Sequence, residues 1–293
     1  MTAPTNPTAY AGLVLAALSS GVSIATTKYA LAGFTATDLL VVELTVATLA
    51  LWSLPGVRRC ARLSFRRGYF LLGLLEPGLA YALFNFGLER TSAADGAVLV
   101  SLESVAIALF AAVFLGERLS RPVVFGAALG VGGAVLLAAH EAHHGASLAG
   151  DTFVVAGVLA AAGYSVVARR LAPGADAAVV TAYQLLAALA VAVLVWLATS
   201  ASGGAMFGRP SVSQWFAAVA TGMLGSAVPF LLYTLAVSRL PAARTGLLSN
   251  LIPVFGVLAA VVLLDERLVA TQLFGAVLVV AGLGAAQLGV RDG

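Results

Sequence analysis

The segment Gly116-Glu117-Arg118-Leu119 returns almost unchanged as Asp265-Glu266-Arg267-Leu268, with Glu266 lying 149 positions after Glu117. The same offset relates residues 73–133 to residues 222–282 without a gap. An internal duplication of this length predicts two structurally similar halves within one chain.

The composition places the chain in a lipid bilayer. Hydrophobic residues make up 61% of the 293 residues and charged residues only 10%, whereas soluble domains carry roughly 25% charged residues. A membrane-spanning helix needs about 20 apolar residues. The chain therefore has room for about ten such helices with short connections.

Long apolar stretches bounded by charged residues, proline or glycine predict the positions of these helices. The ten stretches cover residues 9–30, 38–54, 68–88, 91–115, 122–139, 152–168, 177–198, 214–237, 242–264 and 268–288. They are rich in alanine and leucine, which are strong helix formers, and they lack the strict alternation of a β-barrel strand. The sequence therefore predicts an all-α integral membrane protein with ten transmembrane helices.

The basic residues predict the orientation of the helices, because lysine and arginine accumulate on cytoplasmic loops. With the N-terminus in the cytoplasm, twelve of the sixteen fall inside, and these are Arg58, Arg59, Arg62, Arg66, Arg67, Arg118, Arg121, Arg169, Arg170, Arg239, Arg244 and Arg291. The outer set is Lys28, Arg90, Arg209 and Arg267. We therefore expect both termini in the cytoplasm. Five helices per half is an odd number, so the two five-helix repeats should be inverted relative to each other.

The boundary between the halves is predicted at a polar stretch. We expect the first repeat at residues 1–140, a linker at residues 141–151 and the second repeat at residues 152–293. Two inverted halves can rock around a shared site near the middle of the membrane.

The repeated motif carries a resemblance to a known family. The Glu-Arg-Leu segments, followed by Phe125-Gly126-Ala127 and Phe274-Gly275-Ala276, resemble the EamA type of the drug/metabolite transporter superfamily. The resemblance covers nearly the whole chain and implies a bacterial inner-membrane exporter of amino acids, aromatic ones among them, or of other small metabolites. It also implies a Glu-Pro pair in the fourth helix, but here Ser104 follows Glu103 and Pro253 of the second half has no preceding glutamate.

The third predicted helices carry polar and aromatic residues at positions that match between the halves. The first set is Pro77, Tyr81, Phe84 and Asn85, and the second is Ser226, Phe230, Tyr233 and Thr234. Spacings of four, three and one residues place each set on one helical face. Two such faces predict a common cavity at the midplane, although the same side chains could simply pack between helices.

The fourth predicted helices add small and polar residues to this face. The matching sets are Ala97, Ser101, Ser104 and Ala108, and Gly246, Asn250, Pro253 and Val257. Tyr164 is a candidate in the sixth helix, and at most one of the adjacent Tyr183 and Gln184 can face the site. The expected substrate-binding residues are Tyr81, Phe84, Asn85, Ser101, Ser104, Tyr164, Phe230, Tyr233 and Asn250.

Three carboxylates fall inside predicted spans. An ionised acid at the bilayer centre costs about 3 kcal/mol, so such residues tend to mark function. Glu76 and Glu103 are near mid-span and are candidates for proton coupling, whereas Glu43 lies nearer the outer end and could pair with Lys28. Glu103 is about 200° around a regular helix from Ser101, so either that helix is distorted or Glu103 has a structural role.

Two motifs suggest roles outside the cavity. Glu117 and Glu266 sit at helix ends, where a carboxylate could cap the start of the next helix. The segment His140-Glu141-Ala142-His143-His144 fits the zinc-hydrolase pattern, but a third ligand would have to be a carboxylate such as Asp151. We therefore expect no cofactor and no metal, and keep a membrane zinc metalloenzyme as an alternative.

The sequence as a whole predicts an exporter rather than an enzyme. Its expected substrate is a small amphipathic metabolite, chiefly an amino acid with a large apolar or aromatic side chain, moved by alternating access. Its partners are this substrate and the lipid bilayer, while the dispersed basic residues argue against nucleic acid. An exporter of lipophilic drugs or lipids and a passive facilitator are alternatives, and both a monomer and a dimer fit the sequence.

Overall fold

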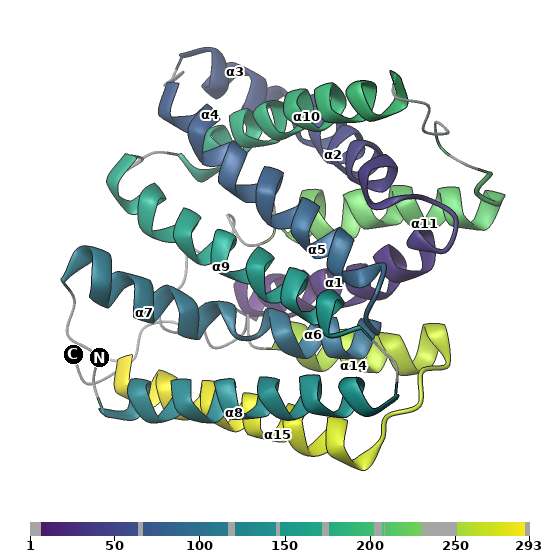
Figure 1. Ribbon diagram of the computed structural model, residues 1–293. Coiled ribbons are helices and arrows are strands. Elements are labelled where there is room, and N and C mark those ends of the chain that lie inside the picture. The colour runs from purple at the N-terminus through teal and green to yellow at the C-terminus, as the bar shows by residue number, and fades with distance from the viewer. Residues whose placement is uncertain are drawn as a thin grey trace.

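The computed structural model describes residues 7–63, 67–116, 121–144, 147–171, 176–201, 207, 209–229, 232 and 251–290. Every regular element within these residues is helical, which confirms the all-α class. Successive long helices run back and forth across the molecule and lie against one another (Figure 1).

The first half of the chain contains nine helical elements within its described residues. They are α1 (Pro7–Leu31), α2 (Ala36–Ser53), α3 (Pro55–Leu63), α4 (Arg67–Gly73), the π-helical turn η1 (Leu74–Leu79), α5 (Ala80–Leu88), α6 (Ala93–Val100), α7 (Glu103–Leu115) and α8 (Arg121–His144). The second half contributes α9 (Leu148–Leu171), α10 (Ala177–Ala201), α11 (Val212–Gly222), the π-helical turn η2 (Met223–Ala227), α14 (Leu251–Leu264) and α15 (Ala270–Val290).

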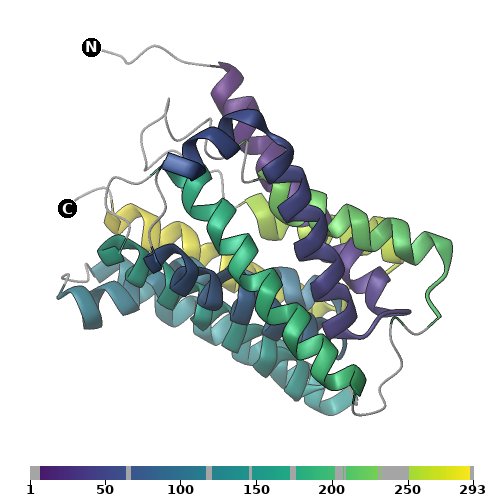
Figure 2. The same ribbon diagram turned by 90° about the horizontal axis from the view of Figure 1, so that it is seen from above.

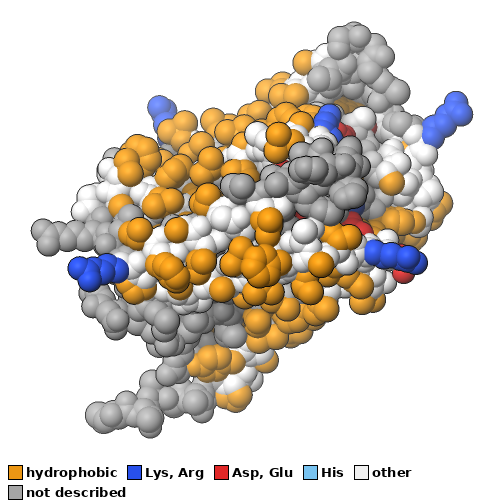
Figure 3. All heavy atoms as spheres, turned by 60° about the horizontal axis from the view of Figure 1, so that its bottom comes forward, with side chains coloured by type: hydrophobic (Ala, Val, Ile, Leu, Met, Phe, Trp, Pro, Cys, Tyr) orange, Lys and Arg blue, Asp and Glu red, His pale blue; other side chains and the backbone are white. Residues whose placement is uncertain are grey.

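Six helical stretches in the described part of the chain are long and apolar enough to cross a membrane. They are Tyr10–Leu31, Ala36–Ser53, Arg67–Leu88, Ala93–Phe114, Leu148–Ala168 and Ala178–Ala198. Hydrophobic side chains cover most of the face seen in Figure 3, and lysine and arginine project from its edges. This distribution suits a surface surrounded by lipid, with the charges kept at the two water interfaces.

Short polar residues fix where several of these helices begin. Thr35 and Asp38 form a reciprocal capping box at the start of α2, and Ser211 and Gln214 form another at α11. Ser92 caps α6 by accepting a hydrogen bond from the Asp95 amide. These side chains satisfy amide groups that have no partner inside the helix, and they set the lengths of the helices.

The third helix is broken, whereas the sequence predicts one continuous span over residues 68–88. At Glu76 the backbone leaves the helical region (φ −142°, ψ 126°), so that α4 and α5 are separated by η1. Pro77 has no amide hydrogen and cannot continue the ladder. At this break, Glu76 and Pro77 face a cavity in the interior of the molecule.

The fourth predicted helix, over residues 91–115, is also divided. The amides of Ser101 and Leu102 donate to carbonyls three residues back, those of Val98 and Leu99, before α7 begins at Glu103. The tighter turn rotates the residues that follow relative to a regular α-helix.

The second half repeats the π-helical turn of the third helix. The turn η2 begins at Met223, which is 149 positions after Leu74 at the start of η1. Here Pro229 has no amide hydrogen, which leaves the Gly225 carbonyl, four residues earlier, without its usual helical donor. The duplication visible in the sequence therefore extends to a local irregularity of the backbone.

The helices α8 and α15 lie antiparallel along each other at one side of the molecule (Figure 1). A Cβ atom on Gly133 would lie 2.6 Å from the Gly275 carbonyl oxygen, and one on Gly282 would lie 2.5 Å from that of Gly126. Gly126 and Gly133 are 149 positions before Gly275 and Gly282, so the two contacts are reciprocal. The fifth and tenth predicted helices therefore pack closely against each other through glycine.

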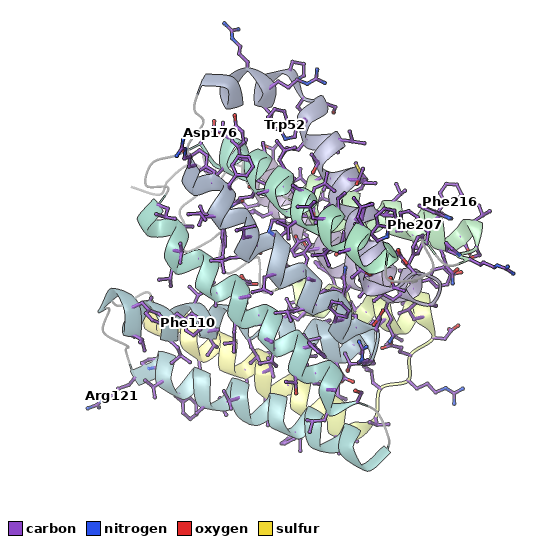
Figure 4. The ribbon with its side chains drawn as sticks, turned by 45° about the horizontal axis from the view of Figure 1, so that its top comes forward. Trp52, Phe110, Arg121, Asp176, Phe207 and Phe216 are labelled. Atoms are coloured by element: carbon purple, nitrogen blue, oxygen red, sulfur yellow. The ribbon has the colours of Figure 1, made fainter. Side chains whose placement is uncertain are left out.

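The helices α2 and α10 form a second antiparallel pair, which lies above α9 in Figure 1 and nearest the viewer in Figure 2. Trp52 at the end of α2 donates to the Ala182 carbonyl near the start of α10, at 3.0 Å. Trp196 near the end of α10 donates to Asp38 near the start of α2, at 2.7 Å. Figure 4 shows Trp52 and Phe207 at opposite ends of this pair.

The segment after α2 is a helix, although the sequence analysis treats its arginines only as part of an inner loop. The Arg58 guanidinium donates to the Trp52 carbonyl and to the Ser53 carbonyl, which anchors the start of α3 to the end of α2. Cys60 on α3 is exposed. A basic helix of this kind suits the membrane surface.

Candidate functional site

A cavity with a volume of about 550 Å³ lies between helices of both halves. Its wall is formed by α1, the two π turns, the division between α6 and α7, α9, α10 and the start of α14. Polar groups on this wall include Glu76, Glu103, Tyr164, Gln184 and Ser226. The volume falls in the range of pockets that bind small molecules.

A second cavity of about 210 Å³ adjoins the first. Glu76, Tyr81, Glu103 and Ser226 line both cavities. Along α1 the larger cavity reaches from Leu13 to Ser20, and the smaller one from Ser20 to Thr27. The two cavities therefore follow each other along α1, and Tyr81 is among the residues that they share.

The helix breaks build the acidic part of this site. Glu76 lies in η1 and Glu103 is the first residue of α7, so both carboxylates project from places where the helix is interrupted. Ser101 and Glu103 both line the larger cavity, which a regular helix would not allow. The helix is thus distorted at this point, as one of the two sequence-based alternatives requires.

Tyr81 connects the two halves across the site. Its hydroxyl donates to the Gly225 carbonyl at 3.5 Å and accepts from the Ser226 hydroxyl at 3.3 Å. The Gly225 carbonyl is the group that Pro229 leaves without a helical donor. The Tyr81 side chain, which lines both cavities, is therefore held by residues of η2.

Asn85 and Glu43 form a buried pair on the wall of the smaller cavity. The Asn85 Nδ2 atom donates to Glu43 Oε1 at 2.9 Å, and the two residues are 1% and 3% exposed. The structure therefore pairs Glu43 with Asn85, where the sequence suggested Lys28. The Lys28 Nζ atom donates to the Leu88 carbonyl at 2.7 Å.

Hydroxyl groups of α1 divide between the cavities and the neighbouring helix. Ser20 and Ser23 line the smaller cavity. Ser19 instead donates to the Leu224 carbonyl of η2 at 2.8 Å, and Thr26 shares a hydrogen bond of 3.0 Å with Thr221 of α11. These last contacts join α1 of the first half to the second half.

Gln184 is a site residue that the sequence analysis did not select. It lines the larger cavity, whereas the adjacent Tyr183 packs against the aromatic rings of Trp52, Tyr69 and Phe70. The expectation that at most one of Tyr183 and Gln184 faces the site is confirmed. A lone amide in the apolar span 177–198 is the signal that could have identified it.

The structure brings together most of the residues proposed from the sequence. Tyr81, Ser101 and Tyr164 line the larger cavity, Phe84 and Asn85 line the smaller one, and Glu76 and Glu103 line both. Phe230, Tyr233 and Asn250 lie outside the described residues, as does the side chain of Ser104.

The acidic groups of the site have no basic counterpart among the described lining residues, which include no lysine, arginine or histidine. Glu76 and Glu103 are close enough to interact electrostatically. Such a site favours a cationic group or a proton between the carboxylates, because two unscreened anions in a low-dielectric interior repel each other.

Glu266 caps a helix, as the sequence predicts, but the helix is not the one that follows it. Its carboxylate accepts from the amides of Ala93 and Ala94 at 2.8 and 3.0 Å. The capped helix is therefore α6 in the other half of the chain. Glu117, its counterpart, lies outside the described residues.

The histidine-rich segment forms the end of α8, which continues through His144. Asp151, the carboxylate considered as a third zinc ligand, lies in the first turn of α9, where its Oδ1 atom accepts from the Thr91 hydroxyl at 2.6 Å. Within the described residues no group of three metal-binding side chains is assembled.

Apolar spanning helices that surround a polar internal cavity define an integral membrane transporter. The model of the EamA-like transporter family matches residues 7–139 and 148–286, and the chain belongs to this family. Proteins of this family are transporters, so the chain is a multi-pass membrane transporter with relatives in bacteria.

Two curated relatives cover most of the chain. The probable terminal-alkyne amino-acid exporter of Streptantibioticus cattleyicolor is 27% identical over 92% of this chain and 90% of its own length. The uncharacterized transporter YyaM of Bacillus subtilis is 25% identical over 73% of this chain and 71% of its own length. A solved crystal structure, 23% identical, has a TM-score of 0.70 and covers 99% of both chains, which shows a shared fold.

Proposed function

We propose that the protein exports amino acids with large apolar or aromatic side chains. The observation that carries the proposal is the cavity of about 550 Å³ between the halves, where Glu76 and Glu103 face apolar residues such as Leu13 and Ile107. An amphipathic amino acid presents an ammonium group to the acids and an apolar side chain to the aliphatic wall. The resemblance to a probable amino-acid exporter supports the same substrate class.

The transport cycle is alternating access in a bacterial inner membrane. Two inverted five-helix repeats, residues 1–140 and 152–293 joined by 141–151, form ten spans with both termini in the cytoplasm. The antiparallel, reciprocal packing of α8 and α15 supports the inversion, because these two helices are equivalent in the duplicated sequence. One of Glu76 and Glu103 carries the coupling proton, and Phe230, Tyr233, Asn250 and Ser104 complete the substrate site.

Transport by the purified protein in liposomes tests this function. Labelled phenylalanine or leucine should exchange against internal unlabelled amino acid, and a pH gradient should drive its accumulation. Exchange without accumulation would support a passive facilitator, and efflux of lipophilic dyes without amino-acid exchange would support a drug or lipid exporter. Absence of amino-acid exchange in folded protein contradicts the proposal.

The orientation is tested by labelling two exposed arginine positions. In a Cys60→Ser background, Arg121→Cys should react with an impermeant maleimide only from the cytoplasmic side, and Arg267→Cys only from the opposite side. Both arginines are exposed in the structure, and Figure 4 shows Arg121 projecting from the start of α8. Labelling of both positions from one side would rule out the inverted arrangement.

A further inference from the structure

Glu43 is a buried carboxyl group that the proposed transport cycle does not use. Among the described residues it lines the smaller cavity and not the larger one. It is 3% exposed, and the hydrogen bond that the structure gives its carboxyl group is the one that Oε1 accepts from Asn85. A neutral amide compensates an ionised carboxylate inside a membrane span only in part. Such a group is suited to take up and release a proton.

The titratable groups that share this cavity with Glu43 are acidic or phenolic. They are Glu76 of η1, Tyr81 of α5 and Glu103 of α7. Tyr81 interacts electrostatically with all three carboxyl groups, so the three acids lie around one side chain. Like charges at such a site repel each other in a low-dielectric interior, and a proton shared among them relieves the repulsion.

The elements packed against α2 bring no fixed positive charge to Glu43 within the described residues. The helices α5, α10 and α11 and the turn η2 contain no charged residue. On α1, the Lys28 Nζ atom donates to the Leu88 carbonyl at 2.7 Å. The arginines of α3 follow the end of α2, and the other charged residue of α2 is Asp38 in its first turn. A proton is therefore the cation that can neutralise Glu43.

The two cavities give the substrate and the proton separate approaches to Glu76 and Glu103. These two carboxyl groups line both cavities, whereas Glu43 lines the smaller one. The smaller cavity has a volume of about 210 Å³ and carries hydroxyl groups such as those of Ser23 and Thr221, which gives it the room and the polar partners for several water molecules. A proton can thus pass between Glu43 and the acidic pair without crossing the space that the substrate occupies.

We propose that Glu43 relays the coupling proton to Glu76 and Glu103 through the smaller cavity. This assignment rests on the proposed amino-acid export and adds the route of the proton. The Glu43 O–H bond breaks, its proton passes through water to the ionised carboxylate of Glu76 or Glu103, and Glu43 then takes a proton from water. The arriving proton neutralises the carboxylate that holds the substrate's ammonium group, which releases the substrate. Asn85 can donate to Glu43 throughout, because the ionised and the neutral carboxyl group both offer an acceptor oxygen.

Two transport measurements on the same proteoliposomes test the relay. Exchange of labelled against unlabelled phenylalanine at equal pH needs no net proton movement, whereas accumulation in vesicles with a more acidic interior does. With one proton per substrate, a gradient of one pH unit should give the wild-type protein about tenfold accumulation, because equal concentration ratios carry equal free energy. Glu43→Gln keeps an acceptor for Asn85 and should leave the exchange rate within about twofold. Its initial rate of accumulation should fall at least about tenfold, as expected when a positioned proton-transfer group is lost.

Two further variants control for effects on the fold. Glu89→Gln is the matched control, because Glu89 Oε1 accepts from the Ala36 amide at the start of α2, at 2.7 Å, and Glu89 is not among the described residues that line the cavities. It should leave exchange and accumulation unchanged. Ala161→Leu keeps Glu43 but fills part of the smaller cavity, which Ala161 lines. It should lower accumulation and spare exchange, and it replaces Glu43→Gln should that variant fail to fold.

The possible outcomes separate the relay from the transport function. If Glu43→Gln or its replacement accumulates phenylalanine as the wild-type protein does, or loses exchange together with accumulation, the relay is wrong and amino-acid export stands. Exchange without accumulation by the wild-type protein also overturns the relay, because no proton is then coupled to export. If the folded wild-type protein neither exchanges nor accumulates phenylalanine, both proposals are wrong.

Discussion

At the scale of single residues, polar side chains inside the spans are held by specific partners. The pair of Asn85 and Glu43 is the clearest case, since both residues are almost fully buried and linked at 2.9 Å. Removing one partner from a buried pair leaves the other unsatisfied, which costs more than the hydrogen bond itself contributes. The pair should therefore stabilise the wall of the smaller cavity.

We expect Asn85→Leu to lower the free energy of unfolding by about 1–3 kcal/mol, because it leaves the Glu43 carboxyl group without its donor. Glu43→Gln should cost less, since a glutamine oxygen can still accept from Asn85. Unfolding of the purified protein in mixed micelles measures both effects. In a double-mutant cycle with Glu43→Leu, the two leucine substitutions should show a coupling of about 0.5–2 kcal/mol, and additive effects would contradict a direct interaction.

At the scale of helices, glycine decides how closely α8 and α15 approach. Gly133 and Gly282 face the backbone of the opposite helix, whereas nothing lies within 4 Å of a Cβ atom at Gly132 or Gly284. Helix pairs in membranes rely on such close approach, because lipid provides no hydrophobic driving force between them. Substitution by alanine should therefore destabilise the protein at Gly133 and Gly282 but not at Gly132 and Gly284.

We expect Gly133→Ala and Gly282→Ala to destabilise the protein by about 1–3 kcal/mol, because the added methyl group meets a backbone carbonyl. The matched controls Gly132→Ala and Gly284→Ala should leave stability unchanged or raise it by up to about 1 kcal/mol through better helix propensity. Thermal unfolding in detergent compares all four. Equal melting temperatures for Gly133→Ala and Gly132→Ala would show that the crossing does not depend on glycine.

At the scale of the whole molecule, hydrogen bonds join the two halves beside the smaller cavity. At the wall of the smaller cavity, Thr26 of α1 contacts Thr221 of α11, and elsewhere the Glu266 carboxylate holds the start of α6. Rocking of the halves must separate some of these contacts for a substrate to leave past them. The Thr26–Thr221 contact, at 3.0 Å between hydroxyls, offers a place to prevent this motion.

We expect a disulfide between Thr26→Cys and Thr221→Cys, in a Cys60→Ser background, to stop amino-acid exchange in liposomes. Oxidation should reduce exchange by at least about tenfold, because the two helices can no longer separate, and reduction should restore it. Each single cysteine variant serves as the control and should be insensitive to oxidation. Full exchange by the cross-linked protein would show that α1 and α11 move together.

The sequence predicted the helical class and several residues of the site because hydrophobic periodicity and polar positions within spans are local signals. Four residues selected from these signals do line a cavity, namely Glu76, Tyr81, Asn85 and Glu103. The sequence left open which of the adjacent Tyr183 and Gln184 faces the cavity, because only the neighbouring helices decide it. The break at Glu76 was missed because apolar residues continue through it.

The amino-acid sequence by itself determined that this is a duplicated, helical membrane protein, since composition, span length and the 149-residue repeat need no tertiary information. The tertiary structure decided where the helices break, that Tyr81 binds the backbone of η2 in the other half and that Glu266 caps a helix of the other half. These features depend on partners more than 100 positions away, such as Gly225 for Tyr81 and Ala93 for Glu266. The residue pattern of one helix does not indicate which distant group will pair with a backbone carbonyl or amide that has no partner inside the helix.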